Sequence, residues 1–74
     1  MKKNLLNRKA KITSDNENYT EFMGKKLIIT HVAYSTSEHP GYDTSLAGEA
    51  LCDFKTIDGK DVPFSLYEYE FKLI

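Results

Sequence analysis

Three side chains in this sequence are common metal ligands or bases, namely His31, His39 and Cys52. They form no C-x-x-C or H-x-x-x-H pattern, which is the spacing typical of a structural zinc site. A Cys–His nucleophile pair needs an accessible thiol, but Cys52 falls on the predicted buried face of a strand, where a thiol acts as a small apolar side chain. The four glycines are isolated, so no phosphate-binding loop is present. The sequence therefore predicts no catalytic residue, no metal site and no cofactor.

The length of the chain limits what it can do. A chain of 74 residues makes one small domain, which buries only about 60% of the surface that its unfolded chain exposes. We therefore expect a binding surface rather than a deep cleft. A single cysteine cannot form an intrachain disulfide, which favours a reducing cytoplasm. The chain has neither a signal-peptide pattern nor the ~20 apolar residues of a membrane span, so we expect a soluble protein without a membrane partner.

Charge is distributed unevenly along the chain. Half of the basic residues lie between Lys2 and Lys11, whereas every acidic residue lies at position 15 or later. We interpret residues 1–7 as a basic tail and residues 8–74 as one acidic domain. The tail either folds back over that domain or contacts nucleic acid. The acidic body argues against DNA or RNA as the main partner, because phosphate contacts need clustered Lys and Arg on a folded face.

The pattern of apolar residues predicts β structure in the first half of the chain. Residues 8–13 alternate charge with Ala10 and Ile12, which indicates a short strand. Residues 14–24 are rich in turn formers and are expected to be a loop with Tyr19, Phe22 and Met23 folded under it. Residues 25–34 are rich in β-branched and aromatic side chains and predict a long, bent strand.

The segment 35–48 is predicted to be a long loop. Its His39-Pro40-Gly41-Tyr42 run fits a type II turn, in which glycine takes a positive φ at the third position. Residues 45–47 are expected to form one helical turn that ends at Gly48.

The last third of the chain predicts an antiparallel meander. Ala50, Cys52 and Phe54 share one face of a strand, and Leu51 falls on the opposite, exposed face. Asp58-Gly59 predicts a type I′ hairpin, after which Val62 and Phe64 return to the core and Pro63 points outward. The S-x-x-E spacing over 65–68 predicts a 3₁₀ turn. Alternation over 68–73 then predicts a closing strand with Tyr69 in the core.

This order of elements resembles the SH3-like small β-barrel. It has a short first strand, a long loop ending in glycine, a long second strand, a second loop, an Asp-Gly hairpin, one 3₁₀ turn and a short closing strand. The resemblance implies a mostly β, five-stranded barrel over residues 8–74. It does not imply PxxP-peptide recognition, because the chain has no tryptophan and its Leu66-Tyr67-Glu68-Tyr69 run lies near the carboxyl end. The strings EHPGYD and SLYEYEF are similar to those of small proteins from Gram-positive bacteria and their phages and prophages.

In SH3-like barrels the second loop and the 3₁₀ turn commonly border one groove, and the resemblance implies a binding surface there. We expect this surface to contain Tyr34, His39, Tyr42, Leu66 and Tyr67, with an acidic rim of Glu38, Asp43 and Glu68. Tyrosine suits such a surface because it combines apolar area with a polar tip. The alternative is that these tyrosines cap the ends of a thin core.

We therefore expect a non-enzymatic protein-interaction module. By the resemblance, it is an accessory protein of a phage or mobile element that binds and occludes a host or phage protein, and its acidic surface fits a basic partner. The alternative is a nucleic-acid-binding barrel that uses the basic amino-terminal arm. Exposed sheet edges permit either a monomer or a weak, strand-paired dimer.

Overall fold

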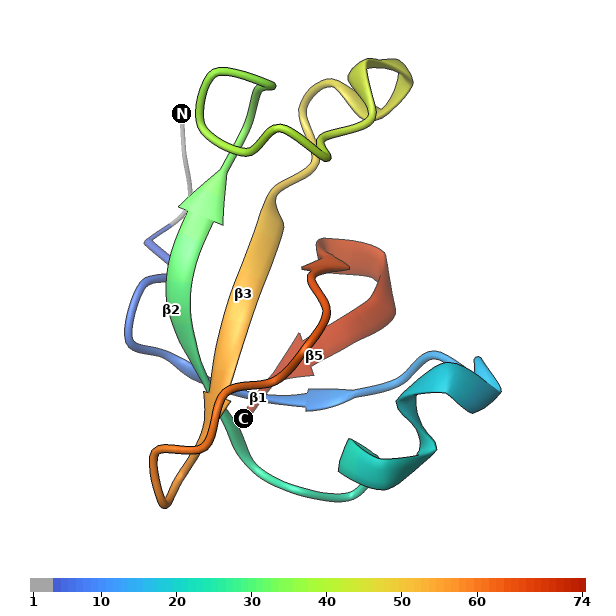
Figure 1. Cartoon of the computed structure of the whole chain (residues 1–74), viewed down its shortest axis with the longest axis vertical. Helices are drawn as coiled ribbons and strands as arrows, with labels where there is room; N and C mark the ends of the chain where they lie inside the picture. The colour runs from blue at the N-terminus through green and yellow to red at the C-terminus, as the bar shows by residue number, and fades with distance from the viewer. Residues whose placement is uncertain (1–3) are drawn as a thin grey trace.

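A single antiparallel sheet forms the framework of the protein in the computed structural model, which describes residues 4–74. The strand order is β4-β3-β2-β1-β5, and short 3₁₀ turns lie between the strands (Figure 1). The elements are β1 Lys9–Ile12, η1 Glu17–Phe22, β2 Leu27–Ala33, η2 Thr44–Leu46, β3 Leu51–Thr56, β4 Leu66–Tyr67, η3 Glu68–Glu70 and β5 Phe71–Leu73. The predicted mostly β, five-stranded class is confirmed.

The two outer strands of this order, β4 and β5, are not paired with each other in residues 4–74. The sheet therefore does not close on itself there, and the expected closed barrel is not confirmed. Within the same residues, no helix has the length and apolar character needed to cross a membrane.

The long strand β2 bends because it contains a β-bulge. Ile29 pairs with Phe54, but the next pair is His31 with Asp53, so Thr30 is one extra residue in the ladder. The bulge changes which residues of β2 face the core. Before the bulge, Ile29 lies on the core side. After the bulge, Val32 lies on the core side, opposite the buried Cys52. This explains why both faces of the predicted strand looked apolar in the sequence.

The β3–β4 hairpin forms at the predicted place but with a different turn. The Gly59 N–H donates to the Thr56 carbonyl at 3.0 Å, and the Thr56 N–H donates to the Lys60 carbonyl at 2.8 Å. Gly59 has a φ of 91°, but Asp58 does not have a positive φ, so the type I′ prediction is wrong. The loop contains three residues, 57–59, and ends in a left-handed glycine.

The prediction for the carboxyl-terminal strand is wrong in its first half. Residues Glu68–Glu70 form η3, and only Phe71–Leu73 form a strand. The physical reason is a backward hydrogen bond, because the Glu70 carboxylate accepts from the Tyr67 N–H at 3.1 Å and so closes a 3₁₀ turn. As a result, Tyr69 is 64% exposed and does not pack in the core as expected. The predicted 3₁₀ turn exists but lies over 68–70 instead of 65–68.

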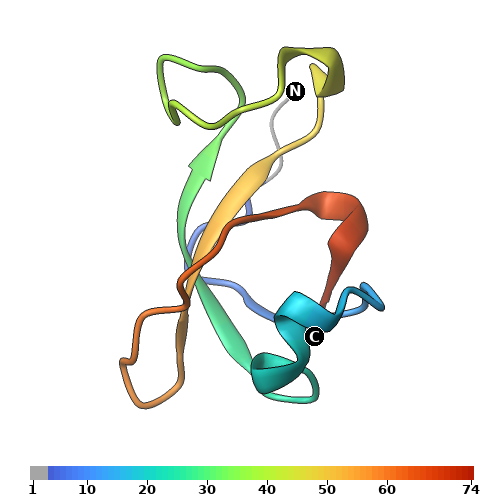
Figure 2. The ribbon, with the colours of Figure 1, turned by 45° about the vertical axis from the view of Figure 1, so that its right-hand side comes forward.

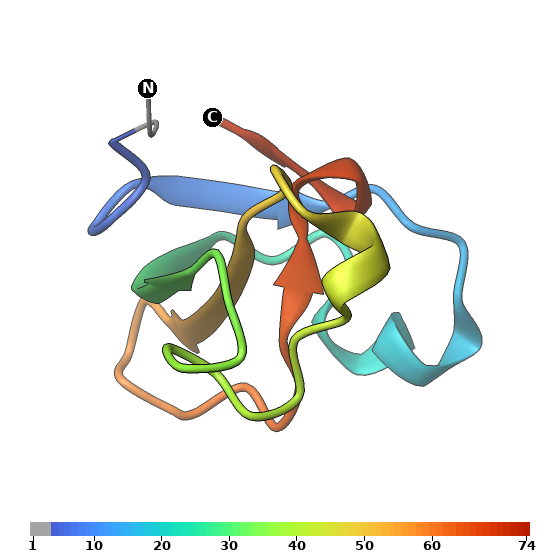
Figure 3. The same ribbon diagram turned by 90° about the horizontal axis from the view of Figure 1, so that it is seen from above.

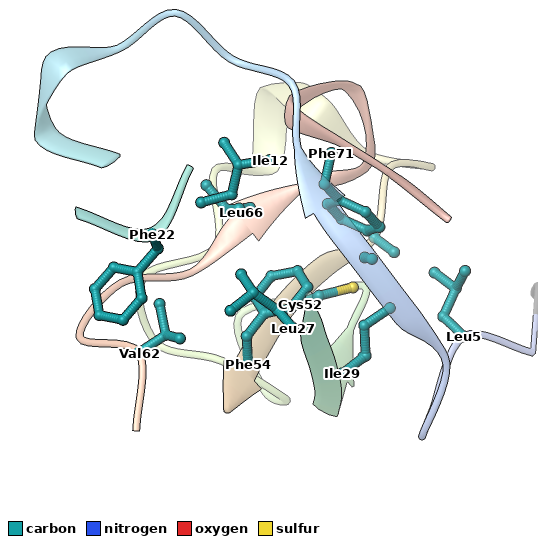
Figure 4. Packing of buried hydrophobic residues seen from close by; sticks show 12 residues of the cluster. Leu5, Ile12, Phe22, Leu27, Ile29, Cys52, Phe54, Val62, Leu66 and Phe71 are labelled. Carbon is teal, nitrogen blue, oxygen red and sulfur yellow. The ribbon is translucent and has the colours of Figure 1, made fainter. Parts of the chain in front are cut away.

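The main core fills the concave side of the sheet (Figure 4). It contains the predicted inward residues of β1 and β3, together with Phe22 from η1 and Leu5 from the segment before β1. The Asn7 N–H donates to the Ile29 carbonyl at 2.8 Å, which holds that segment against β2. Met23 was expected to be covered, but it is 39% exposed.

A second buried group lies outside this main core and consists of Ala33, Tyr42 and Leu51. Ala33 and Leu51 are direct partners across β2 and β3. Leu51 was predicted to be exposed but is buried, because the 35–48 segment crosses this end of the sheet. Figure 2 shows this segment at one end of the β2–β3 pair and the 57–59 hairpin loop at the other.

The 35–48 segment is held by short-range turns. The Tyr42 N–H donates to the His39 carbonyl at 3.0 Å, so a turn forms at the predicted place. Gly41 does not have a positive φ, so the type II prediction is wrong. The predicted helical turn forms one residue earlier, as η2 over Thr44–Leu46 instead of 45–47, and Gly48, whose φ is 100°, follows it after Ala47.

Candidate protein-binding surface

Three tyrosine rings contact one another in sequence, from a buried ring to an exposed one, where the 35–48 segment meets η3. Tyr67 meets Tyr42 edge to face at 5.7 Å and is parallel to Tyr69 within 4° at 6.1 Å. Tyr42 is buried, Tyr67 is half-buried and Tyr69 is 64% exposed. We call these three residues the tyrosine ladder. It connects the second buried group to solvent through ring contacts of the kind that aromatic pairs prefer.

The inner end of the tyrosine ladder is fixed by hydrogen bonds. The Tyr42 hydroxyl donates to the carbonyls of Leu46 at 2.9 Å and Glu49 at 2.5 Å. Burial, and then the neighbouring Tyr67 and Glu49, raise the pKa of Tyr42, so its hydroxyl stays a donor near neutral pH. The Tyr67 hydroxyl accepts the Asp43 N–H at 2.7 Å. The outer ring of Tyr69 therefore stacks on a ring that is already held in place.

Carboxylates lie beside the tyrosine ladder. Asp43 is exposed, and the Ser45 hydroxyl and N–H, both bonded to its carboxylate, lower the pKa of Asp43, so it stays charged near neutral pH. Glu68 lies between the two outer tyrosines in the sequence and is half-buried. Glu38 turns toward its own loop, where its carboxylate accepts the Tyr34 N–H at 3.0 Å. Two of the three predicted rim residues, Asp43 and Glu68, thus lie next to ladder residues.

The other predicted surface residues occupy different environments. Leu66 is completely buried in the main core. Tyr34 is half-buried and packs against the same core. His39 is half-buried and contacts Ser65. The structure therefore brings Tyr42, Asp43 and Tyr67 together as expected and places Leu66 below the surface.

A Ser–His–Asp cluster joins the 35–48 segment to the sheet. His39 Nε2 lies 3.1 Å from Ser65 Oγ and 3.7 Å from Asp53 Oδ1, and the Ser65 hydroxyl donates to Asp53. The other ring nitrogen, His39 Nδ1, accepts the Gly41 N–H at 3.0 Å.

The direction of these bonds differs from that of a serine nucleophile. Because Nδ1 accepts, the proton of neutral His39 is on Nε2, which donates to Ser65. In a catalytic triad the histidine Nε2 instead accepts the serine proton, and the aspartate bonds Nδ1. These contacts instead join His39 of the 35–48 segment to Asp53 of β3 and to Ser65, the residue before β4.

Cys52 lies in the main core and carries no candidate chemistry. Burial, and then Glu68 and Asp53 nearby, raise the pKa of its thiol to about 12. Among residues 4–74, no three His, Cys, Asp or Glu side chains gather closely enough to hold a metal ion.

A shallow depression lies beside η3 and β5. It is lined by Leu5, Glu68, Phe71 and Leu73 and has a volume of about 190 Å³. Small-molecule sites in proteins usually have about 300–1,000 Å³. This depression is therefore smaller than a usual small-molecule site.

Sequence reasoning missed three residues that matter here. Tyr69 was expected inside because alternation continues through 68–73, and only the Glu70 side-chain bond breaks that pattern. Ser65 and Asp53 carry no local signal, because they meet His39 only through long-range folding. The S-x-x-E spacing at Ser65 pointed instead to a helix cap.

Comparison of the chain with protein-family models, with curated proteins and with solved structures finds no match.

Proposed function

We propose that this protein is a non-enzymatic protein-interaction module that binds a basic, apolar-containing segment of a partner on the outer tyrosines. The observation that carries the proposal is Tyr69, which is 64% exposed yet stacked in parallel on Tyr67. Exposed aromatic rings are costly in water and are enriched at the centre of protein interfaces.

The tyrosine ladder reduces the entropic cost of binding. A free tyrosine side chain loses rotamer freedom when a partner fixes it, about 0.5–1.5 kcal/mol for an immobilised side chain. Tyr69 already lies against Tyr67, which is held by Asp43 and Tyr42. The outer rings thus offer a preorganised flat face.

Charge selects the kind of partner. Glu68 lies between the two outer tyrosines in the chain, and Asp43 bonds Tyr67 through its N–H. An arginine can stack on a tyrosine ring and pair with a carboxylate at the same time. A partner segment with Arg or Lys next to a proline or aliphatic residue fits both features, and the adjacent 190 Å³ depression suits the apolar residue.

The order of strands and turns supports an SH3-like architecture for this module. The long β1–β2 connection, the β2–β3 loop and the 3₁₀ turn before β5 occur in the order of that fold. A role as an accessory protein of a phage or mobile element that occludes its target rests on the sequence resemblance alone.

Selection from a random peptide library tests the proposal. We expect enriched peptides to combine Arg or Lys with proline or an aliphatic residue, and to shift the amide NMR signals of residues 67–70. Tyr69→Ala should weaken binding about tenfold or more, as expected of a central interface aromatic, and Glu68→Lys should weaken it further at low salt.

Ile57→Ala is the matched control, because Ile57 is also more than half exposed but lies in the hairpin loop at the far end of β3. It should leave peptide affinity unchanged. Enrichment of acidic peptides, or equal losses in the Tyr69 and Ile57 variants, would reject this surface.

A further inference from the structure

Lysines gather on the outer face of the sheet, opposite to the main core. On β1, Ala10 and Ile12 point into the core, so Lys9 and Lys11 point outward. Lys11 is the direct partner of Lys72 on β5, and Lys9 is the partner of Ile28 on β2. Ile28 in turn pairs with Lys55 on β3. Figure 3 shows β1 and the carboxyl-terminal strand side by side.

A fifth lysine extends the first of these rows. The β1–β2 register, continued by one step beyond Ala10 and Leu27, places Lys26 opposite Lys11. Two cross-strand rows result. The first contains Lys26, Lys11 and Lys72, and the second contains Lys9, Ile28 and Lys55. We call this set the lysine face: Lys9, Lys11, Lys26, Lys55 and Lys72. It holds five of the seven lysines in residues 4–74.

Few acidic groups neutralise the lysine face. Asp61 lies 3.8 Å from Lys55. Asp53 follows on the same side of β3 and keeps its negative charge, but its contacts are Ser65 and His39 and not a lysine. The carboxylate oxygens of Glu70 contact Tyr19 and Tyr67. Among residues 4–74, no carboxylate lies within 4.0 Å of Lys9, Lys11, Lys26 or Lys72.

The pairing of Lys11 with Lys72 is unfavourable for folding. Side chains directly opposite each other on one face of an antiparallel pair lie about 4.5–5.5 Å apart at Cβ, and like charges there are destabilising. An anionic ligand bound to this row would reduce the repulsion between the lysines.

We propose that the lysine face binds the phosphate backbone of nucleic acid without reading its sequence. Nucleic acid fits better than an acidic protein because the face provides regular positive charge but no exposed aromatic or deep pocket, and protein interfaces depend on such apolar anchors. The lysines project from paired strands, so their spacing is fixed by the sheet. This surface is separate from the tyrosine ladder, and the two proposals can fail independently.

Fluorescence anisotropy with a labelled mixed-sequence oligonucleotide, single-stranded and duplex, tests this inference on the full chain. Three to five phosphate contacts predict a slope of about −2 to −4 for log affinity against log salt with single strands. The double variant Lys11→Glu, Lys72→Glu should lose about tenfold or more in affinity at about 50 mM salt. It replaces one like-charge pair by another, so the fold should be retained, which denaturant unfolding checks.

The matched control is Lys25→Glu, Lys60→Glu, which changes the net charge equally. Lys60 lies beside the hairpin near Glu21, and Lys25 lies over the Phe22 ring, so neither belongs to the two cross-strand rows of the lysine face. This variant should lose much less affinity. Equal losses in both double variants, salt-independent binding, or tighter binding of a poly-glutamate peptide than of the oligonucleotide would overturn the inference.

Discussion

Cys52 illustrates how the position of one residue decides its chemistry. The thiol is fully buried in the main core, and its pKa is raised to about 12 from its ordinary value of 9.0. The folded state therefore favours the neutral thiol more strongly than the unfolded state does. This contribution to stability is complete below about pH 9 and is lost as the pH rises toward 12.

We predict that alkaline pH removes part of the advantage of wild type over Cys52→Ala. Denaturant unfolding of both proteins should show the difference in unfolding free energy shrinking by about 1.4 kcal/mol per pH unit above about pH 9. Comparison with the alanine variant cancels the titration of tyrosines and lysines. A constant difference between pH 8 and pH 11 would contradict the assigned burial of the thiol.

Leu51 provides a second test at the level of single residues, because alternation predicts it outside and the structure buries it. Leu51→Ala should cost about 2–4 kcal/mol of unfolding free energy, as for other buried leucines. Leu6→Ala is the same substitution at a 49% exposed position and should cost under about 1 kcal/mol. Similar small losses in both variants would mean that the 35–48 segment does not cover Leu51.

Among the elements, the hairpin loop depends on the backbone of Gly59. At a φ of 91°, a side chain with Cβ is strained, and nothing lies within 4 Å of the position that Cβ would occupy. Gly59→Ala should therefore destabilise through backbone conformation alone, by about 1–2 kcal/mol. Gly59→Asn should cost less, because asparagine adopts left-handed conformations more readily. Thermal unfolding of the two variants measures both effects, and equal melting temperatures for the Ala variant and wild type would contradict the assigned turn.

The elements also show which parts of the fold can be predicted from the sequence. Strands β1, β2 and β3 follow from alternation and β-branched content, since Ala10, Ile12, Cys52 and Phe54 sit where period two places them. The errors occur where a side chain bonds the backbone. The Glu70 bond to the Tyr67 N–H converts half of a predicted strand into η3, a contact that alternation does not reveal.

The candidate surface could be predicted only in part. The expected meeting of Tyr42, Asp43 and Tyr67 follows from the proximity of the second loop and the 3₁₀ turn. The exposed position of Tyr69 could not be predicted, because it depends on the local turn. The hydrogen bonds that join His39, Ser65 and Asp53 connect residues far apart in the chain. Nothing in a single sequence indicates such pairs.

At the scale of the whole molecule, net charge describes the surface poorly. The ten basic and eleven acidic residues of the whole chain sum to a formal net charge of −1, although the carboxylates beside the tyrosine ladder and the lysines of the lysine face belong to different surfaces. The excess of acidic residues after position 11 is an average over faces of different charge, so it does not exclude a contact between one face and nucleic acid. The clustering of the lysines becomes visible only from the pairing register of the strands and not from the amino-acid composition.

This separation of charge predicts opposite effects of one substitution on folding and binding. Lys11→Glu replaces a like-charge pair with an attractive pair opposite Lys72, so unfolding free energy should rise by about 0.2–1 kcal/mol at low salt. The same variant should bind oligonucleotide more weakly. Denaturant unfolding and anisotropy on one preparation measure both. A loss of stability would show that the two lysines do not face each other as the register indicates.

The pairing of the first and last strands also determines how the domain responds to mechanical force. The Ile74 N–H donates to the Lys9 carbonyl at 3.0 Å, so the start of β1 and the end of β5 lie at the same end of their ladder. Tension applied at these two points peels the strands apart one hydrogen bond at a time instead of shearing all of them together.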